Sequence, residues 1–324
     1  MTRIADRWPQ VAKRLPHLDF VRGPSPVRQL PSVGPEVWVK DDSLIGEHYG
    51  GNKIRKLEWS LAELHHKGVR TVLTAGGLGT NHGLATALYA KQLGMKVVLL
   101  LVDQPMSDEV QRNLDAMRAA GASIMTARSP RGALALAPLA LLRNTRWRAP
   151  GVLPIGGSNP AGVLGFVEAG LELAEQVEAG LLPAPRRIVV AVGSGGSAAG
   201  LLLGCRLAGL DCEIRGILVN DRTRITEQSI SRMAVRSANL LRKHGAQQSP
   251  VKLPGLTLDR RFLGQGYGYS TTDGDDAAEL FAADGIVLDP VYTAKAGASM
   301  LARDLGAGPT LFWHTHSDVA LESA

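Results

Sequence analysis

The amino-acid sequence predicts an α/β protein with two domains, each containing a largely parallel sheet flanked by helices. Short apolar segments typical of strands alternate along the chain with longer segments that have helical periodicity. Glycine occurs 37 times while aromatic residues make up only 5% of the chain, which is typical of a fold with many tight strand-to-helix turns. The length of 324 residues, of which 45% are hydrophobic, is sufficient for two domains with substantial cores.

The predicted elements follow one another in a strand–helix–strand order. We expect strands at 36–40, 71–75, 96–102, 122–126, 188–192 and 215–219, and helices at 53–67, 81–93 and 108–120. A further helix is expected in the alanine- and leucine-rich segment 132–142, and an apolar strand directly before Thr315. Repeated strand–helix–strand units place neighbouring strands in parallel, so both sheets are predicted to be largely parallel.

The charge of the chain argues against a nucleic-acid partner. The net charge is +6 and the pI is near 9.5, but the basic residues are dispersed. Those from Arg222 to Lys243, for example, have Glu227 among them and Asp221 beside them. Dispersed positive charge of this kind favours a small anionic cofactor and amino-acid carboxylates rather than a nucleic acid.

The cysteine pattern and the apolar segments exclude other classes. Cys205 and Cys212 have no further cysteine partners, so we expect neither a disulfide framework nor a metal site. The first ten residues lack the apolar core of a signal peptide. The longest apolar stretch, 133–142, is interrupted by Pro138 and is too short to cross a bilayer. We therefore expect a cytoplasmic protein without membrane contact.

Two glycine-containing segments carry the strongest indication of function. Segment 50–57, GGNKIRKL, places Lys53 on a glycine-hinged turn that enters an amphipathic helix. The second segment lies between the predicted strand 188–192 and a following helix, where backbone N–H groups can form a nest for a phosphate. Its residues are Gly193, Ser194, Gly195, Gly196 and Ser197. A lysine amine together with a phosphate cradle indicates pyridoxal 5'-phosphate (PLP), although each segment alone could also be an ordinary helix start or turn.

The glycine segment also fits a dinucleotide-binding pattern, Gly193-x-Gly195-x-x-Ala198. That pattern requires an acidic residue at the carboxyl end of the next strand, about 20 residues further on. Asp211 and Glu213 have nearly the right spacing but precede the strand, and Asp221 lies too far along. We therefore favour PLP over a nucleotide and keep a nucleotide-binding dehydrogenase as the weaker alternative.

Five motifs occur in an order and spacing that resembles the D-cysteine desulfhydrase and 1-aminocyclopropane-1-carboxylate (ACC) deaminase family. The motifs are GGNKIRKL at 50–57, TAGGLGTNH at 74–82, PIGGSN at 154–159, the glycine segment at 193–197, and LDPVYTAK at 288–295. The resemblance runs from about residue 15 to about residue 317. It implies the tryptophan synthase β-like arrangement called PLP fold type II, with a small domain at 57–160 inserted into a large domain formed by 1–56 and 161–324. We also expect a homodimer.

The resemblance assigns roles to single residues. Lys53 corresponds to the lysine that binds PLP covalently and then moves the α-proton of the substrate, while Lys56 on the same helical face is its competitor. Asn81 corresponds to the asparagine that binds the phenolic oxygen of PLP. Thr80, Asn81 and the following His82 lie at a helix start that can hold a substrate carboxylate, although His82 alone is more often a packed histidine.

Further side chains of the resemblance lie near the C-terminus. Tyr267 and Tyr292 match tyrosines that line the active site, and a role in the core remains an alternative for both. Thr315 matches the residue that faces the pyridine nitrogen. A hydroxyl at this point suits β-elimination better than transamination.

Three departures bear on specificity. The family usually has serine at the position of Thr80, so the extra methyl group puts the substrate size in question. His316 and Ser317 stand where the family commonly has two glycines. Thr293 stands where ACC deaminases have glutamate, which favours a desulfhydrase-like enzyme.

The sequence thus predicts a PLP-dependent lyase that acts on a small β-substituted amino acid such as D-cysteine and produces pyruvate and ammonia. Threonine at position 293 argues against ACC as the substrate. Three alternatives stay open: β-replacement in amino-acid biosynthesis, ACC deamination, and a catalytically silent PLP-binding protein.

Overall fold

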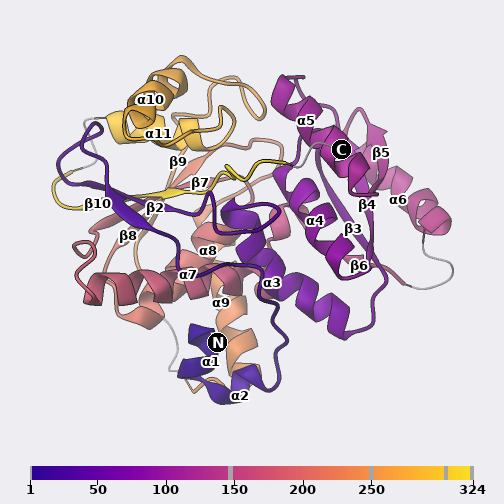
Figure 1. The fold of residues 1–324 in the computed structure, drawn as a ribbon, viewed down its shortest axis with the longest axis horizontal. Helices are drawn as coiled ribbons and strands as arrows, with labels where there is room; N and C mark the ends of the chain where they lie inside the picture. The colour runs from indigo at the N-terminus through magenta and orange to yellow at the C-terminus, as the bar shows by residue number, and fades with distance from the viewer. Residues whose placement is uncertain (1, 145–148, 248–251, 303–305, 322–324) are drawn as a thin grey trace.

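The computed structural model describes residues 2–144, 149–247, 252–302 and 306–321. These residues form an α/β fold with two separate sheets, each flanked by helices (Figure 1). The fold class predicted from the sequence is confirmed.

The larger sheet has six strands in the order β1-β2-β10-β7-β8-β9. Every neighbouring pair is parallel except β1 with β2, so the sheet is mixed but largely parallel. The residues of β7 after Arg187 are buried because helices cover both faces of the sheet. The strands are β1 (Val27–Gln29), β2 (Val37–Asp41), β7 (Arg187–Val192), β8 (Glu213–Leu218), β9 (Leu256–Asp259) and β10 (Thr310–His314).

Two groups of helices enclose this sheet. One face packs against a large apolar core to which α1 (Arg3–Arg7), α2 (Pro9–Ala12), α7 (Pro160–Glu178), α8 (Gly196–Ala208) and α9 (Glu227–Lys243) contribute. The other face packs against α10 (Thr272–Ala283) and α11 (Thr293–Leu301). Ile188 and Val190 of β7 belong to the first core and Val189 to the second, as the alternation of side chains along a strand requires.

The smaller sheet has four parallel strands in the order β5-β4-β3-β6. They are β3 (Thr71–Gly77), β4 (Lys96–Val102), β5 (Ser123–Ala127) and β6 (Gly151–Val152). One face packs against α3 (Gly51–His66), α4 (Asn81–Gln92) and α5 (Asp108–Ala119), and the other against α6 (Pro130–Asn144). A short 3-10 helix, η1 (Ile155–Gly157), leads from β6 to α7. Among the helices of the described ranges, none is both long enough and apolar enough to cross a membrane.

The elements with clear periodicity lie where the sequence places them. Strand 96–102 has the predicted bounds, helix 108–120 ends one residue earlier, and segment 132–142 lies inside α6. Strands β1, β6 and β9 were not anticipated, because segments of two to four residues are too short to show an alternating pattern.

The two sheets come from different parts of the chain. All strands of the smaller sheet lie between residues 71 and 152, whereas the larger sheet takes its strands from 27–41 and 187–314. The predicted boundary after residue 56 falls inside α3, whose Ile54 and Leu57 pack in the small-sheet core while Trp59 packs in the large one. The boundaries at 57 and 160 therefore stay a prediction.

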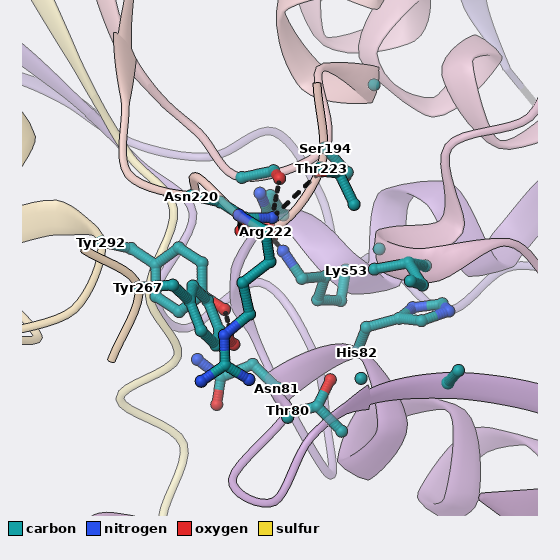
Figure 2. Close-up of a pocket in the computed structure, with 18 of the residues that line it drawn as sticks. Lys53, Thr80, Asn81, His82, Ser194, Asn220, Arg222, Thr223, Tyr267 and Tyr292 are labelled. Carbon is teal, nitrogen blue, oxygen red and sulfur yellow. Dashed lines mark hydrogen bonds between the residues drawn. The ribbon is translucent and has the colours of Figure 1, made fainter. Parts of the chain in front are cut away.

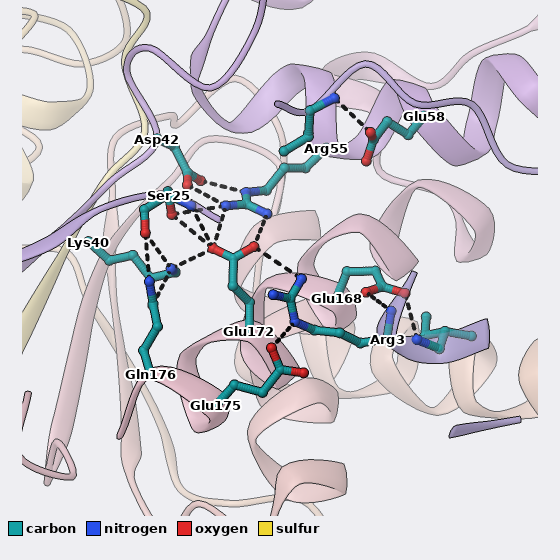
Figure 3. A network of polar contacts seen from close by, with 12 residues as sticks. Arg3, Ser25, Lys40, Asp42, Arg55, Glu58, Glu168, Glu172, Glu175 and Gln176 are labelled. Atoms are coloured by element: carbon teal, nitrogen blue, oxygen red, sulfur yellow. Dashed lines mark hydrogen bonds and ion pairs between the residues drawn. The ribbon is translucent and has the colours of Figure 1, made fainter. Parts of the chain in front are cut away.

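A buried network of charged side chains fixes α3 against the larger sheet (Figure 3). Arg55 of α3 donates to both carboxylate oxygens of Asp42 at 2.8 and 3.0 Å and to Oε1 of Glu172 on α7 at 3.1 Å. Lys40 of β2 donates to the same Glu172 oxygen at 2.6 Å. Ser25 and Gln176 complete the hydrogen bonds of the two cations.

Glu172 is the shared anion of this network. Burial alone would raise the pKa of Glu172, but the attraction of Arg55 and Lys40 outweighs burial and holds this pKa at about 2. The pKa of a glutamate in an unfolded chain is about 4.3. The stabilisation that Glu172 contributes is therefore fully present above about pH 4.3 and is lost as the pH falls toward the folded value.

We expect Glu172→Gln to lower the free energy of unfolding by about 3 kcal/mol or more, because it leaves Arg55 and Lys40 buried without their shared anion. Urea denaturation at pH 7 measures the change. Glu175→Gln, three residues along α7, is the matched control. The Glu175 side chain is 57% exposed and pairs with Arg3 at the surface, so the control should lose less than about 1 kcal/mol. Equal losses in both variants would contradict a special contribution of the network.

Candidate active site

A cavity of about 360 Å³ lies where the carboxyl ends of β3, β7, β8 and β10 face the amino ends of α3, α4 and α8. This is where α/β proteins usually bind ligands, since the loops after parallel strands meet at one edge. Twelve of the thirteen predicted site residues line this cavity: Lys53, Thr80, Asn81, His82, Gly193, Ser194, Gly195, Gly196, Ser197, Tyr267, Tyr292 and Thr315. Figure 2 shows the side chains of Lys53, Thr80 and the two tyrosines converging on it.

The start of α3 fits closely against the end of β10 because the first residue of the helix is a glycine, Gly51. Gly51 has a φ of +70°, and a Cβ atom there would lie 2.5 Å from the carbonyl oxygen of Thr315. That carbonyl accepts a hydrogen bond of 3.1 Å from the backbone N–H of Asn52, and the carbonyl of Asp42 accepts one from Gly51. The glycine hinge thus holds Lys53 in the first turn of α3, inside the cavity.

The amine of Lys53 contacts an amide oxygen and faces an aromatic ring. Its Nζ donates to Oδ1 of Asn52 at 2.7 Å and lies 5.9 Å from the centre of the Tyr292 ring. Burial lowers the pKa of Lys53 to about 8, against the opposing effect of the Asp289 carboxylate. About a tenth of this amine is therefore uncharged at pH 7 and about half at pH 8, and the uncharged form is able to attack an aldehyde.

The predicted phosphate cradle has the geometry of an anion-binding nest. Gly195 adopts a left-handed conformation with φ +84° at the start of α8, and no side chain caps the N–H groups of that helix. The hydroxyls of Ser194 and Ser158 lie 2.8 Å apart beside it, and Asn220 donates to the carbonyl of Gly193 at 2.8 Å. The free N–H groups and the helix dipole favour an anion.

Lys56 lies against this cradle. Its Nζ donates to the carbonyl of Gly156 at 3.1 Å. A Cβ atom on Gly196 would lie 3.0 Å from that Nζ and 2.4 Å from the Ser158 hydroxyl, so only glycine leaves this space open. Burial and the nearby Lys53 lower the pKa of Lys56 well below its usual range, and a bound phosphate would favour its charged form. The residues present therefore fit a phosphate-bearing aldehyde.

Thr80 caps α4, and its methyl group lies over the first turn of that helix. Its Oγ1 accepts a hydrogen bond from the N–H of Gly83 at 3.2 Å. Its methyl carbon lies 2.5 Å from where a Cβ atom on Gly83 would be, next to Met117 and Leu99. The methyl group thus fills the space left by Gly83, so the departure from serine need not reduce the cavity.

Asn81 and His82 contribute two further polar groups. The Oδ1 of Asn81 accepts from Nδ2 of Asn113 at 2.9 Å, which fixes the orientation of its side chain. Burial, together with Lys53 and Lys56, lowers the pKa of His82 to about 3, so its ring is neutral. Neither ring nitrogen of His82 has a hydrogen-bond partner among the described residues. A buried ring without partners at a cavity wall is suited to a ligand.

The two predicted tyrosines form a pair. Their hydroxyl oxygens lie 2.6 Å apart and their rings meet edge to face. Burial raises the pKa of Tyr292 well above its usual range and raises that of Tyr267 less far, because Tyr292 and Arg222 oppose the change. Both side chains therefore stay protonated and can donate or relay a proton.

Thr293 is the one predicted site residue that does not line the cavity. Its hydroxyl donates to Oδ2 of Asp289 at 2.7 Å and accepts from the backbone N–H of Asp289 at 2.8 Å. Asp289 itself lines the cavity and accepts from the N–H groups of Val291 and Tyr292. Thr293 thus acts on the site through Asp289.

The two departures after Thr315 also take part in the site. The Nδ1 of His316, which lines the cavity, lies 3.7 Å from Oδ2 of Asp289. Ser317 accepts a hydrogen bond from the N–H of Gly50 at 2.7 Å, which ties the end of β10 to the glycine hinge. Ser317 thus holds the glycine hinge, while His316 lies near Asp289.

Several cavity residues received no role from the sequence. They include Tyr49, Asn220, Arg222 and Thr223, together with Ser158 and Asp289, which lie in two of the five motifs. The place of residues 220–223 in the chain could have indicated a role in the site. They follow β8, whose carboxyl end lies beside that of β7. Arg222 in particular was grouped with the dispersed surface cations.

The fold and the site together define a PLP-dependent enzyme of fold type II. A profile of the family described as "Pyridoxal-phosphate dependent enzyme" matches residues 18–316, and the chain belongs to this family. The expected resemblance is also confirmed by a solved structure described as an ACC deaminase homologue. That protein is 30% identical, and the match covers 97% of this chain and 94% of the other with a TM-score of 0.80.

More distant structures share the fold. An L-serine ammonia-lyase from Rhizomucor miehei is 18% identical, with a TM-score of 0.63 over 94% of this chain and 96% of the other. A threonine deaminase from Solanum lycopersicum is 16% identical, with a TM-score of 0.62 over 98% of this chain and 85% of the other. The cofactor is pyridoxal 5'-phosphate, as the sequence predicts. This finding leaves the nucleotide-binding dehydrogenase without support.

We expect borohydride reduction followed by peptide mapping to place the phosphopyridoxyl group on Lys53. The rate of PLP uptake by the apoprotein should rise with pH and level off above about 8, because the uncharged amine is the reactive form and its pKa is lowered to about 8. Absorbance after rapid mixing measures this rate. A label on Lys56 would refute the assignment.

We expect Gly196→Ala to weaken PLP binding by tenfold or more, about 1.4 kcal/mol, because its methyl group would press on Ser158 and Lys56. Ser194→Ala removes one hydroxyl from the same loop and should cost about 1 kcal/mol. Equilibrium dialysis of the apoproteins gives both values, and circular dichroism verifies their folding. Wild-type affinity in a folded Gly196→Ala protein would show that phosphate does not bind here.

Proposed function

We propose that the enzyme catalyses β-elimination on a small β-substituted amino acid such as D-cysteine, releasing pyruvate and ammonia. The observation that carries this proposal is the convergence on one cavity of a buried amine, a helix start and a hydroxyl pair, supplied by Lys53, α4 and the tyrosines Tyr267 and Tyr292. The similarity to an ACC deaminase homologue supports deaminating chemistry.

Each part of the cavity has a distinct task in this reaction. Lys53, Asn81, Thr315 and the cradle at 193–197 would hold the cofactor, which when bound withdraws electrons and makes the α C–H bond of an amino acid acidic. The N–H groups at the start of α4 and the Thr80 hydroxyl bind the substrate carboxylate. His82 borders the same space.

Proton transfers are assigned to groups with suitable pKa values. The amine of Lys53 accepts the proton from the α-carbon, since its pKa is lowered toward the working range. The hydroxyl pair of Tyr267 and Tyr292 stays protonated and can donate a proton to a leaving group such as a thiolate. The Cβ–X bond breaks with its electron pair on X. Released aminoacrylate takes up water and loses ammonia to give pyruvate.

Three alternatives are ACC deamination, β-replacement and a catalytically silent protein, and each makes a different demand on the cavity. ACC deamination is disfavoured because Thr293 provides no carboxylate and its hydroxyl is bound to Asp289. β-Replacement would need a nucleophile to enter before aminoacrylate leaves. A silent PLP-binding protein would show cofactor absorbance that no amino acid alters.

The cytoplasmic location and the homodimer stay predictions.

We expect detectable pyruvate from D-cysteine or β-chloro-D-alanine and little or no 2-oxobutyrate, the four-carbon product of ring opening, from ACC. Lactate dehydrogenase detects pyruvate, ammonia release detects turnover of ACC, and the panel contains both enantiomers of each chiral substrate. Lys53→Ala is the control for chemistry that does not need the enzyme. Turnover of ACC that exceeds that of every β-substituted amino acid would overturn the proposal.

A further inference from the structure

Arg222 places a cation in the cavity that the proposed chemistry does not use. It lies in the loop after β8 and lines the cavity together with Asn220 and Thr223. Figure 2 shows its side chain running from this loop past Tyr267 in the direction of Asn81. The guanidinium carbon lies 5.1 Å from the centre of the Tyr267 ring.

Two contacts hold the guanidinium in place. It stacks over Tyr267, whose backbone N–H is bound to Asp221 at 3.1 Å, and its Nη1 donates to the carbonyl of Asp103 at 2.8 Å. Asp103 directly follows β4 of the smaller sheet, so Arg222 reaches from one sheet to the other across the cavity. Although Arg222 is exposed, these two contacts restrain its side chain, so it loses less side-chain freedom on binding an anion than an unrestrained arginine would.

The charge of Arg222 has no anionic partner in the described part of the chain. No carboxylate of the described residues forms an ion pair with it, and Asp221 is engaged by Tyr267. Arginine carries five N–H donors, and one of them is used by the Asp103 carbonyl. The remaining donors suit the planar, two-point recognition of an oxyanion.

Two other donor sites of the cavity already have anions assigned to them. Lys56 and the cradle face the phosphate, and the start of α4 faces the α-carboxylate of the substrate. We propose that Arg222 binds a second anion, an oxyanion on the β-substituent of the substrate. This inference rests on the proposed β-elimination and adds a preference within it: amino acids whose side chain ends in a negatively charged oxygen group should be better substrates than those without one, such as D-cysteine and β-chloroalanine.

An oxyanionic leaving group also simplifies the reaction. With serine O-sulfate, the Cβ–O bond breaks with its electron pair on the sulfate oxygen, and Lys53 keeps the α-proton. Sulfate leaves as an anion without needing a proton, and Arg222 stabilises the charge that develops on it. Aminoacrylate, water and the retained proton then give pyruvate and ammonium.

The test compares a charged substrate with a neutral one. We measure kcat/KM of the holoenzyme for serine O-sulfate and for β-chloroalanine, both enantiomers, by pyruvate release. Arg222→Gln should lower the value for serine O-sulfate about 30- to 100-fold and that for β-chloroalanine less than about threefold, since a charge-assisted bond is lost only with the former. Arg222→Lys keeps the positive charge but lacks the planar guanidinium with its paired N–H donors. Its kcat/KM for serine O-sulfate should therefore lie between those of the wild type and Arg222→Gln.

A matched control lies in the same loop. Arg224 is exposed and is not among the residues that line the cavity, so Arg224→Gln should leave both values unchanged. Circular dichroism verifies that all variants fold. Equal losses for both substrates in Arg222→Gln would show that Arg222 binds the common α-carboxylate, and no loss would show that it only closes the cavity; either result overturns the proposal.

A binding measurement separates this inference from the reaction itself. Aspartate carries a side-chain carboxylate and no leaving group, whereas alanine carries neither. Titration of the cofactor absorbance should show tighter binding of aspartate than of alanine, by tenfold or more, and Arg222→Gln should abolish this preference. If neither elimination substrate reacts but the aspartate preference is present and depends on Arg222, the proposed function fails and the second anion site stands. Absence of the preference overturns the inference.

Discussion

The buried ion network around Arg55 is the interaction on which the rest of the site depends. Arg55 is two residues from Lys53 in the first turns of α3, and its guanidinium is held by Asp42 and Glu172 (Figure 3). Asp42 follows β2, and Glu172 lies on the long helix α7. A buried cation cannot leave its anions without a large loss of free energy. The network therefore fixes the position of α3 and, with it, the amine of Lys53.

Burial also decides how the ionisable groups of the cavity behave. Burial lowers the pKa values of Lys53, Lys56 and His82, and repulsion by neighbouring lysines lowers those of Lys56 and His82 further. Asp289 is a carboxylate that lines the same cavity, and it draws the pKa of Lys53 upward. The protein thus keeps a reactive amine and a neutral imidazole beside a cradle that favours an anion.

The departures from the family pattern are compensated by neighbouring residues. The extra methyl group of Thr80 fills the space above Gly83, where any side chain would collide with it. Ser317 holds the glycine hinge, and His316 approaches Asp289. Each of these side chains thus has a contact in the fold that accommodates it.

The sequence by itself determined the fold class, the cofactor and twelve cavity residues. Strands β4 and β7 and helix α5 follow from local periodicity, and the lysine and glycine motifs carry their chemistry within a few adjacent residues. Such signals are local, so the chain order alone reveals them.

The tertiary structure decided what depends on contacts between distant segments. Arg222 meets Asp103 across 119 residues, and Arg55 meets Glu172 across 117. Thr293 turns to Asp289 although the motif suggested a place in the cavity. A side chain's partner, burial and pKa are set by the elements that fold around it, and these are properties that no short stretch of sequence contains.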